Sequence, residues 1–204
     1  TLDDWSNIQS MDTRNTTRDD IIRVGLEILG DKGFNSCGID AVLKTAKIPK
    51  GSFYYYFPSK EEFGLAVLDL FAVQAKAHAE SYLQDKSLTP MARLRRYLND
   101  VAAEIEEEGC KRGCFLGNMT QEMAGQNDRF RVRLNEIWDG WKRIIADCLR
   151  EAKAAKELKR DADVDLLAEF IIIGLEGGML RAKVSKTALP MKDMADILFE
   201  RVLV

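Results

Sequence analysis

Residues 39–57 read IDAVLKTAKIPKGSFYYYF, and this stretch predicts the fold of the first part of the chain. Apolar residues three and four apart indicate a helix from about Ile39 to Ala46, with Val42 and Leu43 facing inward. A short link that ends in proline then leads to a second, very short helix from Lys50 to Phe57. Two helices joined by so short a turn predict a helix-turn-helix unit, in which the second helix enters the major groove of DNA.

The second of these helices carries three consecutive tyrosines, which cannot all face one core. Phe53 and Phe57 lie four residues apart and are expected to share the buried face, so that the tyrosines point outward. Tyrosine and serine hydroxyls and lysine ammonium groups bind phosphate oxygens, and a glycine lets the backbone approach DNA closely. An aromatic core cluster is the alternative interpretation; the helix-turn pattern before the tyrosines favours DNA binding.

The composition of the chain is that of a globular protein. Of its 204 residues 46% are hydrophobic and 31% charged, and no apolar run reaches the roughly 18 residues that a membrane span needs. The formal net charge of -3 argues against a protein that coats nucleic acid through bulk charge, although residues 41–60 contain lysines and no Asp or Glu. Since the polar first residues do not resemble a secretory signal, we expect a cytoplasmic protein without a membrane partner, whose four cysteines are thiols.

The rest of the chain is predicted to be helical as well, because apolar residues recur at helical spacing and alternating strand patterns are not sustained. Further helices are expected to begin at Thr16 or Thr17, to cover Lys60–Leu83, and to lie near Met91–Glu108, Cys114–Met123, Asp128–Ala155, Val164–Val184 and Met191–Val204. The fold class is therefore all-α with about nine helices. We expect a flexible arm over residues 1–15, a three-helix DNA-binding domain over 16–62 and a helical effector-binding and dimerisation domain over 63–204.

The segments GIDAVL (38–43) and AKIPKGSFYYYFPSKEE (46–62) resemble the DNA-binding signature of the TetR family of repressors. The resemblance covers roughly residues 17–71 and implies that the short third helix reads the major groove. Tyr55 stands where many members of that family have histidine, which leaves its base contact open. The candidate DNA-binding residues are Thr17, Lys50, Gly51, Ser52, Tyr54, Tyr55, Tyr56 and Lys60.

The same resemblance implies a homodimer that binds a palindromic operator in double-stranded DNA and releases it when a small effector tilts the fourth helix. We expect the dimer interface in the last two helices, where glycines follow an apolar run and allow close helix approach. The candidate interface residues are Ile173, Gly174, Gly177 and Gly178.

Cys114 is the candidate sensor of the effector. It follows Lys111 and Arg112 and is expected in the first turn of a helix, and both adjacent cations and a helix N-terminus stabilise a thiolate. Cys110 instead follows three glutamates, whose negative charge opposes ionisation. This pair has no nearby histidine, and zinc normally requires four clustered ligands, so neither a metal site nor a cofactor is expected.

The segments RGCFLGNM (112–119), QEM (121–123) and LRAK (180–183) are similar to a TetR subgroup that senses acrylate-like or other small electrophiles. A thiolate can add to an activated double bond or be oxidised. Glu176 and Lys183 share a helix face, so they point into one cavity, or else Lys183 forms a surface salt bridge. The candidate effector-sensing residues are Cys114, Met119, Glu122, Trp138, Trp141, Glu176 and Lys183, of which the methionine and the tryptophans are equally typical of a core.

Two other functions stay open at this point. A repressor gated by noncovalent ligand binding would use Cys114 only as a structural thiol. A helical enzyme with Cys114 as nucleophile would need a general base, and the sequence offers none nearby, nor a phosphate-binding loop, so we do not expect an enzyme. The sequence does not determine the operator, the target genes, the identity of the effector, or whether regulation is repression or activation.

Overall fold

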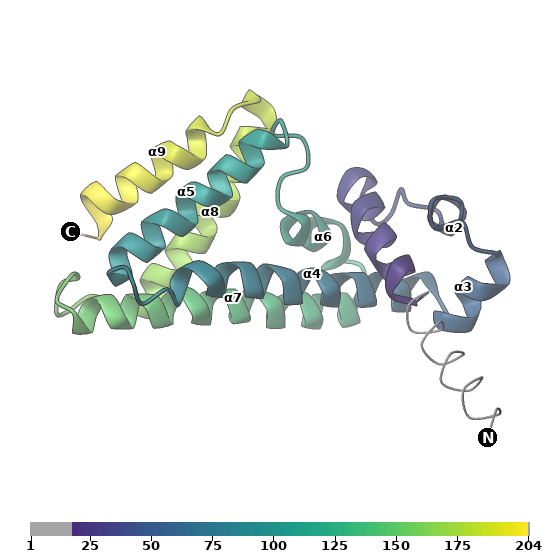
Figure 1. The fold of residues 1–204 in the computed structure, drawn as a ribbon, viewed down its shortest axis with the longest axis horizontal. Helices are drawn as coiled ribbons and strands as arrows, with labels where there is room; N and C mark the ends of the chain where they lie inside the picture. Colours follow the sequence, from purple (N-terminus) through teal and green to yellow (C-terminus); the bar gives the residue numbers. More distant parts are fainter. Residues whose placement is uncertain (1–17, 204) are drawn as a thin grey trace, which may run out of the picture. The chain divides into compact units, whose positions relative to one another are not determined.

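A computed structural model of the chain describes residues 18–203, and within them all regular structure is helical, as predicted. The arm predicted over residues 1–15 and the candidate DNA contact Thr17 lie outside the described residues. Among the helices described, none is both long and apolar enough to span a membrane. The helices are a first helix over residues 18–32, α2 (Ile39–Ala46), α3 (Lys50–Tyr56), α4 (Lys60–Leu83), α5 (Pro90–Glu107), α6 (Phe115–Met123), α7 (Asp128–Ala154), α8 (Val164–Ser185), α9 (Leu189–Ile197) and a π-helical turn, η1 (Leu198–Val202) (Figure 1).

The chain divides into two compact units, with the division after Val73, within α4. The domain boundary predicted from the sequence lies earlier in the chain, between residues 62 and 63. The first half of α4 belongs to the N-terminal unit because Phe63 and Val67 are buried against the first helix. A Cβ atom added at Gly25 would overlap the Phe63 ring and come within 2.7 Å of a Val67 methyl carbon, so the two helices approach closely at this glycine.

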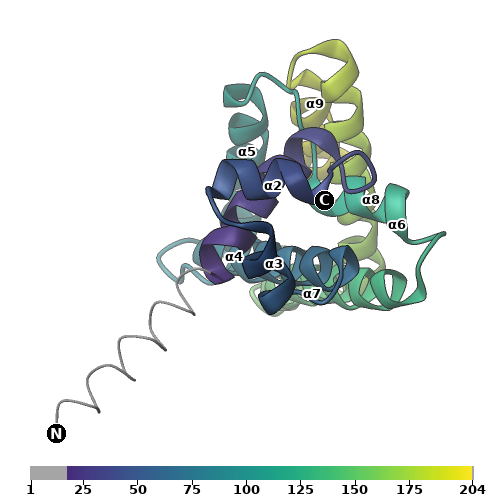
Figure 2. The ribbon, with the colours of Figure 1, turned by 90° about the vertical axis from the view of Figure 1, so that its right-hand side faces the viewer.

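An aromatic core holds the N-terminal unit together. The rings of Phe53 and Phe57 each pack against Phe63, with centroids 5.3 and 5.4 Å apart. Edge-to-face contacts of this kind contribute about 0.5–1.5 kcal/mol beyond area burial. The first helix adds the buried Ile21 and Leu29, and α2 adds the buried residues Val42 and Leu43. Figure 2 shows α2 leading into the short helix α3. As predicted, the short helix α3 is therefore anchored by its two phenylalanines.

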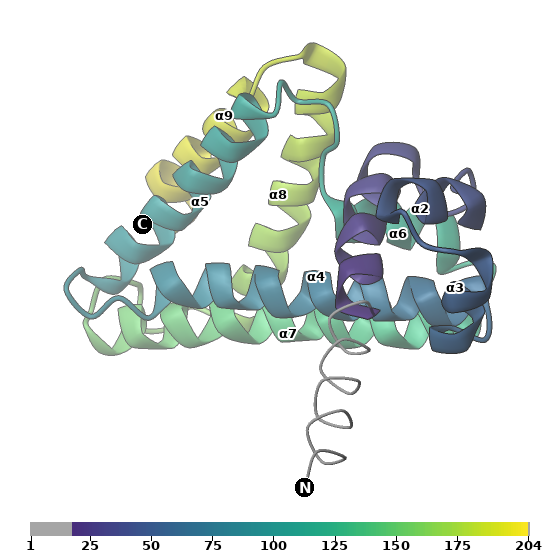
Figure 3. The same cartoon turned by 45° about the vertical axis from the view of Figure 1, so that its right-hand side comes forward.

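In the C-terminal unit α8 packs between α7 and α9, and α5 contacts both α7 and α9. Figures 1 and 3 show α5 running beside α9. The stripe predicted on α7 is largely confirmed, because Phe130, Leu134, Ile137 and Cys148 are buried, whereas Trp141 and Ile144 are only half-buried. The C-terminal helix is shorter than predicted, since α9 ends at Ile197 and the backbone widens into the π-helical turn η1.

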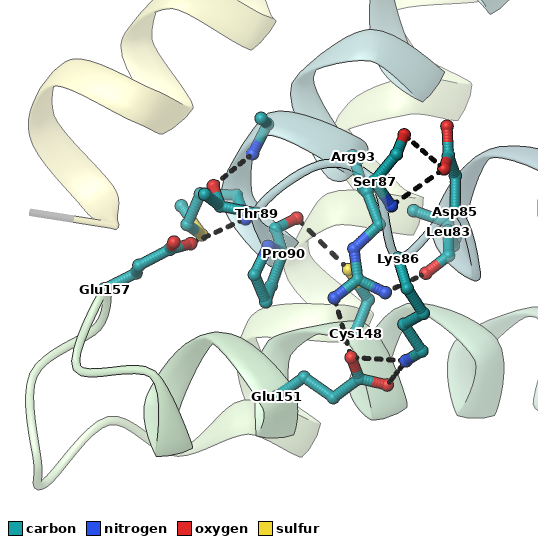
Figure 4. Close-up of polar contacts among 12 residues, drawn as sticks. Leu83, Asp85, Lys86, Ser87, Thr89, Pro90, Arg93, Cys148, Glu151 and Glu157 are labelled. Atoms are coloured by element: carbon teal, nitrogen blue, oxygen red, sulfur yellow. Dashed lines mark hydrogen bonds and ion pairs between the residues drawn. The ribbon is translucent and has the colours of Figure 1, made fainter.

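A buried arginine ties three segments of this unit together (Figure 4). The side chain of Arg93 on α5 is only 2% exposed, and it donates hydrogen bonds to the carbonyl of Leu83 at 2.7 Å and to a carboxylate oxygen of Glu151 on α7 at 2.6 Å. Lys86 binds the same carboxylate. The hydrogen bonds that Glu151 accepts from Lys86, the larger effect, and from Arg93 hold the pKa of its carboxyl group below the usual range. The arginine is thus a structural residue that joins the end of α4, α5 and α7.

Candidate DNA-binding surface and effector cavity

The turn between α2 and α3 presents α3 as a short, exposed helix. Lys47 ends α2 in the left-handed conformation, with φ 55°, and its N–H donates to the carbonyl of Leu43. Pro49 then precedes the first residue of α3 with an extended backbone, which directs the chain into the new helix. Because Phe53 is fully buried one turn later, the opposite face of α3 is left to solvent.

Most of the predicted DNA-binding residues gather on this solvent face. Tyr54 and Tyr55 are 48% and 67% exposed, and a Cβ atom added at Gly51 would meet nothing within 4 Å. Tyr56 is half-buried, with its ring 5.1 Å from that of Tyr55 in an edge contact. These side chains and the open backbone at Gly51 can meet phosphates and base edges without rearrangement of the core.

The basic residues of this surface have partners within the N-terminal unit. Lys50 is exposed, with its Nζ 3.3 Å from a carboxylate oxygen of Asp40. Lys60 is half-buried, because its Nζ lies 4.5 Å from the centre of the Phe34 ring and donates to the carbonyl of Asn35. Ser52 is half-buried, and its backbone N–H donates to the carbonyl of Pro49. Lys50 can turn to DNA by releasing an exposed ion pair, which costs little.

A cavity of about 160 Å³ lies in the C-terminal unit between α6 and α8. Of the predicted effector-sensing residues, the structure brings Cys114, Glu176 and Lys183 together in its wall. Met119 is buried in the core, and neither it nor Glu122, Trp138 or Trp141 lines this cavity. The lining residues that sequence reasoning did not single out are Gly113, Gly117, Asn118, Gln121, Met179 and Leu180, together with Gly177, which had been assigned to the dimer interface.

Trp138 and Lys183 have specific polar partners. Trp138 donates its indole N–H to the hydroxyl of Thr120 at 3.0 Å, and the two tryptophan rings, from Trp138 and Trp141, meet edge to face at 5.5 Å. This pair is part of the packing of α7 against α6. Lys183 is half-buried at the cavity and donates to the carbonyl of Arg112 at 3.3 Å. The glycine-rich loop before α6 thus contacts α8 at the edge of the cavity.

Cys114 caps the N-terminus of α6, and its sulfur accepts a hydrogen bond from the N–H of Gly117 at 3.4 Å. The predicted stabilisation of its thiolate is nevertheless wrong. Burial raises the pKa of the Cys114 thiol well above its ordinary value, and the carboxylate of Glu176 raises it further. Lys111 and Arg112, which were expected to lower it, are exposed to solvent. The resting form is therefore a thiol hydrogen-bonded to Glu176.

Glu176 is the unusual group of this cavity. Burial raises the pKa of its carboxyl group, and its Oε1 atom is buried with no hydrogen-bond partner among the described residues. Space for the carboxylate exists because residue 117 is glycine: a Cβ atom there would overlap Oε2 of Glu176. Since a buried acceptor without a donor is costly, a hydrogen-bond donor brought to this oxygen would stabilise the site.

The predicted dimer glycines divide into two groups. A Cβ atom at Gly174 would lie 3.2 Å from Met194, and one at Gly178 would lie 3.1 Å from Met191, so these two glycines admit α9 of the same chain. The helix that these glycines approach closely is therefore α9, and their place in a dimer interface stays a prediction. Ile173 is 62% exposed and Gly177 is also exposed. They belong to an apolar stripe at helical spacing along α8, whose exposed large members are Leu166, Phe170, Ile173, Leu180 and Val184.

Comparison with known proteins covers both units. Residues 21–67 match the model described as bacterial regulatory proteins, tetR family, and residues 90–198 match the tetracyclin repressor-like C-terminal domain. The transcriptional regulator AcuR of Cereibacter sphaeroides is 44% identical over 163 residues, which cover 80% of this chain and 74% of that protein. The HTH-type transcriptional repressor DhaR of Mycobacterium sp. (strain GP1) is 30% identical over 190 residues, covering 93% of this chain and 94% of that protein. The crystal structure of a regulatory protein TetR from Rhodobacter sphaeroides aligns with a TM-score of 0.84 at 40% identity, over 91% of this chain and 98% of that one.

Proposed function

Because the chain belongs to the TetR family of bacterial transcriptional regulators, we propose that it binds a palindromic operator as a homodimer through α3 and releases it when a small molecule occupies the cavity beside Glu176. Proteins of this family are regulators and not enzymes. The observation that carries the DNA-binding part is the pair of exposed tyrosines, Tyr54 and Tyr55, on a short helix whose opposite face is fixed by the buried Phe53. Thr17 and Lys60 are the flanking backbone contacts in this proposal.

The DNA-binding part is tested by equilibrium titration of the duplex upstream of the protein's own gene, at fixed salt and against random DNA. Tyr55→Ala is expected to lower specific affinity by about 10-fold or more, because each lost base-reading contact costs about 1–3 kcal/mol. Val73→Ala is the matched control, since Val73 is exposed on α4, well beyond the α3 segment in the chain. Binding no tighter than to random DNA would refute this part of the proposal.

The homodimer is proposed from the apolar stripe on α8. Isolated exposed apolar residues are ordinary, but a row at spacings of three and four on one helix face is typical of a helix interface. In a two-fold dimer the stripe of one subunit would pack against the same stripe of the other. One charged substitution would therefore place two charges in the interface. We expect Ile173→Asp to shift the protein to monomers in sedimentation velocity, while Ile173→Leu keeps the dimer. A wild-type protein that sediments as a monomer at micromolar concentration would contradict the proposal.

The effector is proposed to be a small electrophile or short unsaturated acid, because residues 112–123 and 180–183 resemble the electrophile-sensing subgroup. The protonated thiol and the buried carboxylate support a definite reaction. The sulfur of Cys114 would bond to the β-carbon of an activated double bond as its π bond breaks. The thiol proton would pass to Glu176 and from there to the α-carbon, so that no other reactant is needed.

Two measurements separate covalent from noncovalent sensing. Operator release by acrylate and by a stronger thiol-reactive electrophile is followed with wild-type protein, Cys114→Ser and the control Cys148→Ser, whose thiol donates to the carbonyl of Pro90 outside the cavity. The covalent route predicts a mass increase of one effector on Cys114 and no release from Cys114→Ser. Normal release from Cys114→Ser combined with lost release from Glu176→Leu would instead establish noncovalent gating in the same cavity. Release unaffected by both Cys114→Ser and Glu176→Leu would remove the cavity from the proposal.

A further inference from the structure

A second polar cluster, whose residues do not line the effector cavity, lies on the surface where the end of α4 meets α5. It consists of His78 on α4 and of Asp100 and Glu104 on α5. The imidazole Nε2 is 3.0 Å from a carboxylate oxygen of Asp100, and Nδ1 is 3.8 Å from one of Glu104. We propose that these three side chains form a binding site for a divalent transition-metal ion of the zinc class, which would clamp α4 to α5.

The spacing of the three ligand atoms suits such an ion. One atom from each side chain lies within 4.8 Å of the other two. Ligands about 2.0–2.2 Å from a tetrahedral zinc ion are separated from each other by roughly 3.4 Å. The cluster therefore closes around an ion through side-chain movements on the order of 1 Å. Asp100 and Glu104 are four residues apart on one helix, so their carboxylates already point to the same side.

The charge of the cluster also favours a dication. Two carboxylates balance the charge of one divalent ion, and the exposed Glu107 and Glu108 add further negative potential. A bound dication would relieve the repulsion among these carboxylates.

The ligand types indicate which ions fit. An imidazole with two carboxylate oxygens is a borderline-to-hard donor set, which suits Zn²⁺, Co²⁺ or Mn²⁺ better than the soft cuprous ion. Tyr82 supplies an outer partner, since its hydroxyl is hydrogen-bonded to Asp100 and thereby orients that carboxylate. Each of the side chains His78 and Asp100 is about one-third exposed, so an ion and its remaining water ligand have access from solvent.

The decisive test uses the fact that the chain contains one histidine. Tag-free, nitrogen-15-labelled full-length protein is titrated with Zn²⁺, and the two imidazole nitrogen resonances of His78 are followed by NMR. We expect one of them to move to the position of a metal-bound nitrogen and to saturate at one ion per protomer. Zinc binding that leaves both resonances in place, or the absence of binding at a large molar excess, would overturn the proposal.

Matched variants exclude a purely structural effect. His78→Gln and Glu104→Gln are each expected to weaken zinc binding in calorimetry by at least about 10–100-fold, the loss typical of removing even an outer partner. Glu107→Gln removes the same charge from the same helix outside the cluster and is expected to retain most of the affinity. Circular dichroism checks that each variant is folded. Equal losses for Glu104→Gln and Glu107→Gln would mean diffuse electrostatic attraction and would refute a defined site.

Discussion

Replacing Glu151 by alanine is the sharpest test of how the C-terminal unit is held together. The change leaves the buried Arg93 guanidinium with the carbonyl of Leu83 as its remaining described partner. Removing one member of a fully buried ion pair costs about 3–5 kcal/mol. Because the Glu151 side chain is 42% exposed, water screens part of this loss, and we expect about 2 kcal/mol.

The assay is urea unfolding followed by circular dichroism, at one protein concentration since a dimer makes stability concentration-dependent. With an m-value of about 2 kcal/mol per molar, a loss of about 2 kcal/mol moves the midpoint down by roughly 1 M. Lys86→Ala is the control, because Lys86 binds the same carboxylate but is 65% exposed and should cost at most about 1 kcal/mol. If the two variants shift the midpoint equally, the burial of Arg93 does not determine the energy of this network, and the reasoning fails.

Three further predictions concern DNA, acidity and packing. Lys50→Ala is expected to lower the slope of log affinity against log salt concentration by about 1 per protomer, measured by fluorescence anisotropy. An unchanged slope would mean that Lys50 does not contact a phosphate. Glu176→Gln is expected to stabilise the protein at neutral pH but not below about pH 4. A carboxyl with a raised pKa stabilises the fold below its unfolded pKa and loses that contribution as pH rises through its folded pKa. Unfolding curves at both pH values test this, and an equal change in stability at the two pH values would contradict it. Gly178→Ala is expected to destabilise the protein by about 1 kcal/mol, because its new methyl group would press against the α9 backbone. Gly140→Ala has nearly open space around it and should stabilise the protein by up to about 1 kcal/mol in the same thermal scan; the reverse order would contradict the packing described.

Local patterns were enough to predict the helices of this chain. The ranges Ile39–Ala46 and Lys60–Leu83 were predicted to the residue, because apolar spacing, proline and capping chemistry act over a few neighbouring positions. The exposure of Tyr54 and Tyr55 also followed from their adjacency to a buried Phe53, since three consecutive side chains on a helix cannot share one face.

Contacts between distant segments were not accessible in the same way. The neighbours of Cys114 in sequence are cations, and they predicted a stabilised thiolate, but its decisive neighbour is Glu176, far along the chain. Burial and this carboxylate reverse the expected shift. The glycines of α8 show the same limit, because their spacing indicated close helix packing without indicating that the partner was α9 of the same chain.

Residue types and short spacings therefore sufficed to predict the all-helical fold class, the recognition helix with its anchoring phenylalanines, and the family to which the chain is similar. These properties depend on residue type and on spacings of a few residues. Three other features arise from the packing of distant segments: Cys114 rests as a protonated thiol beside Glu176, Arg93 is buried against Glu151, and His78 meets two carboxylates of α5. Burial and charge at a site are sums over groups brought together by packing, and the spacing of residues along the chain does not contain them.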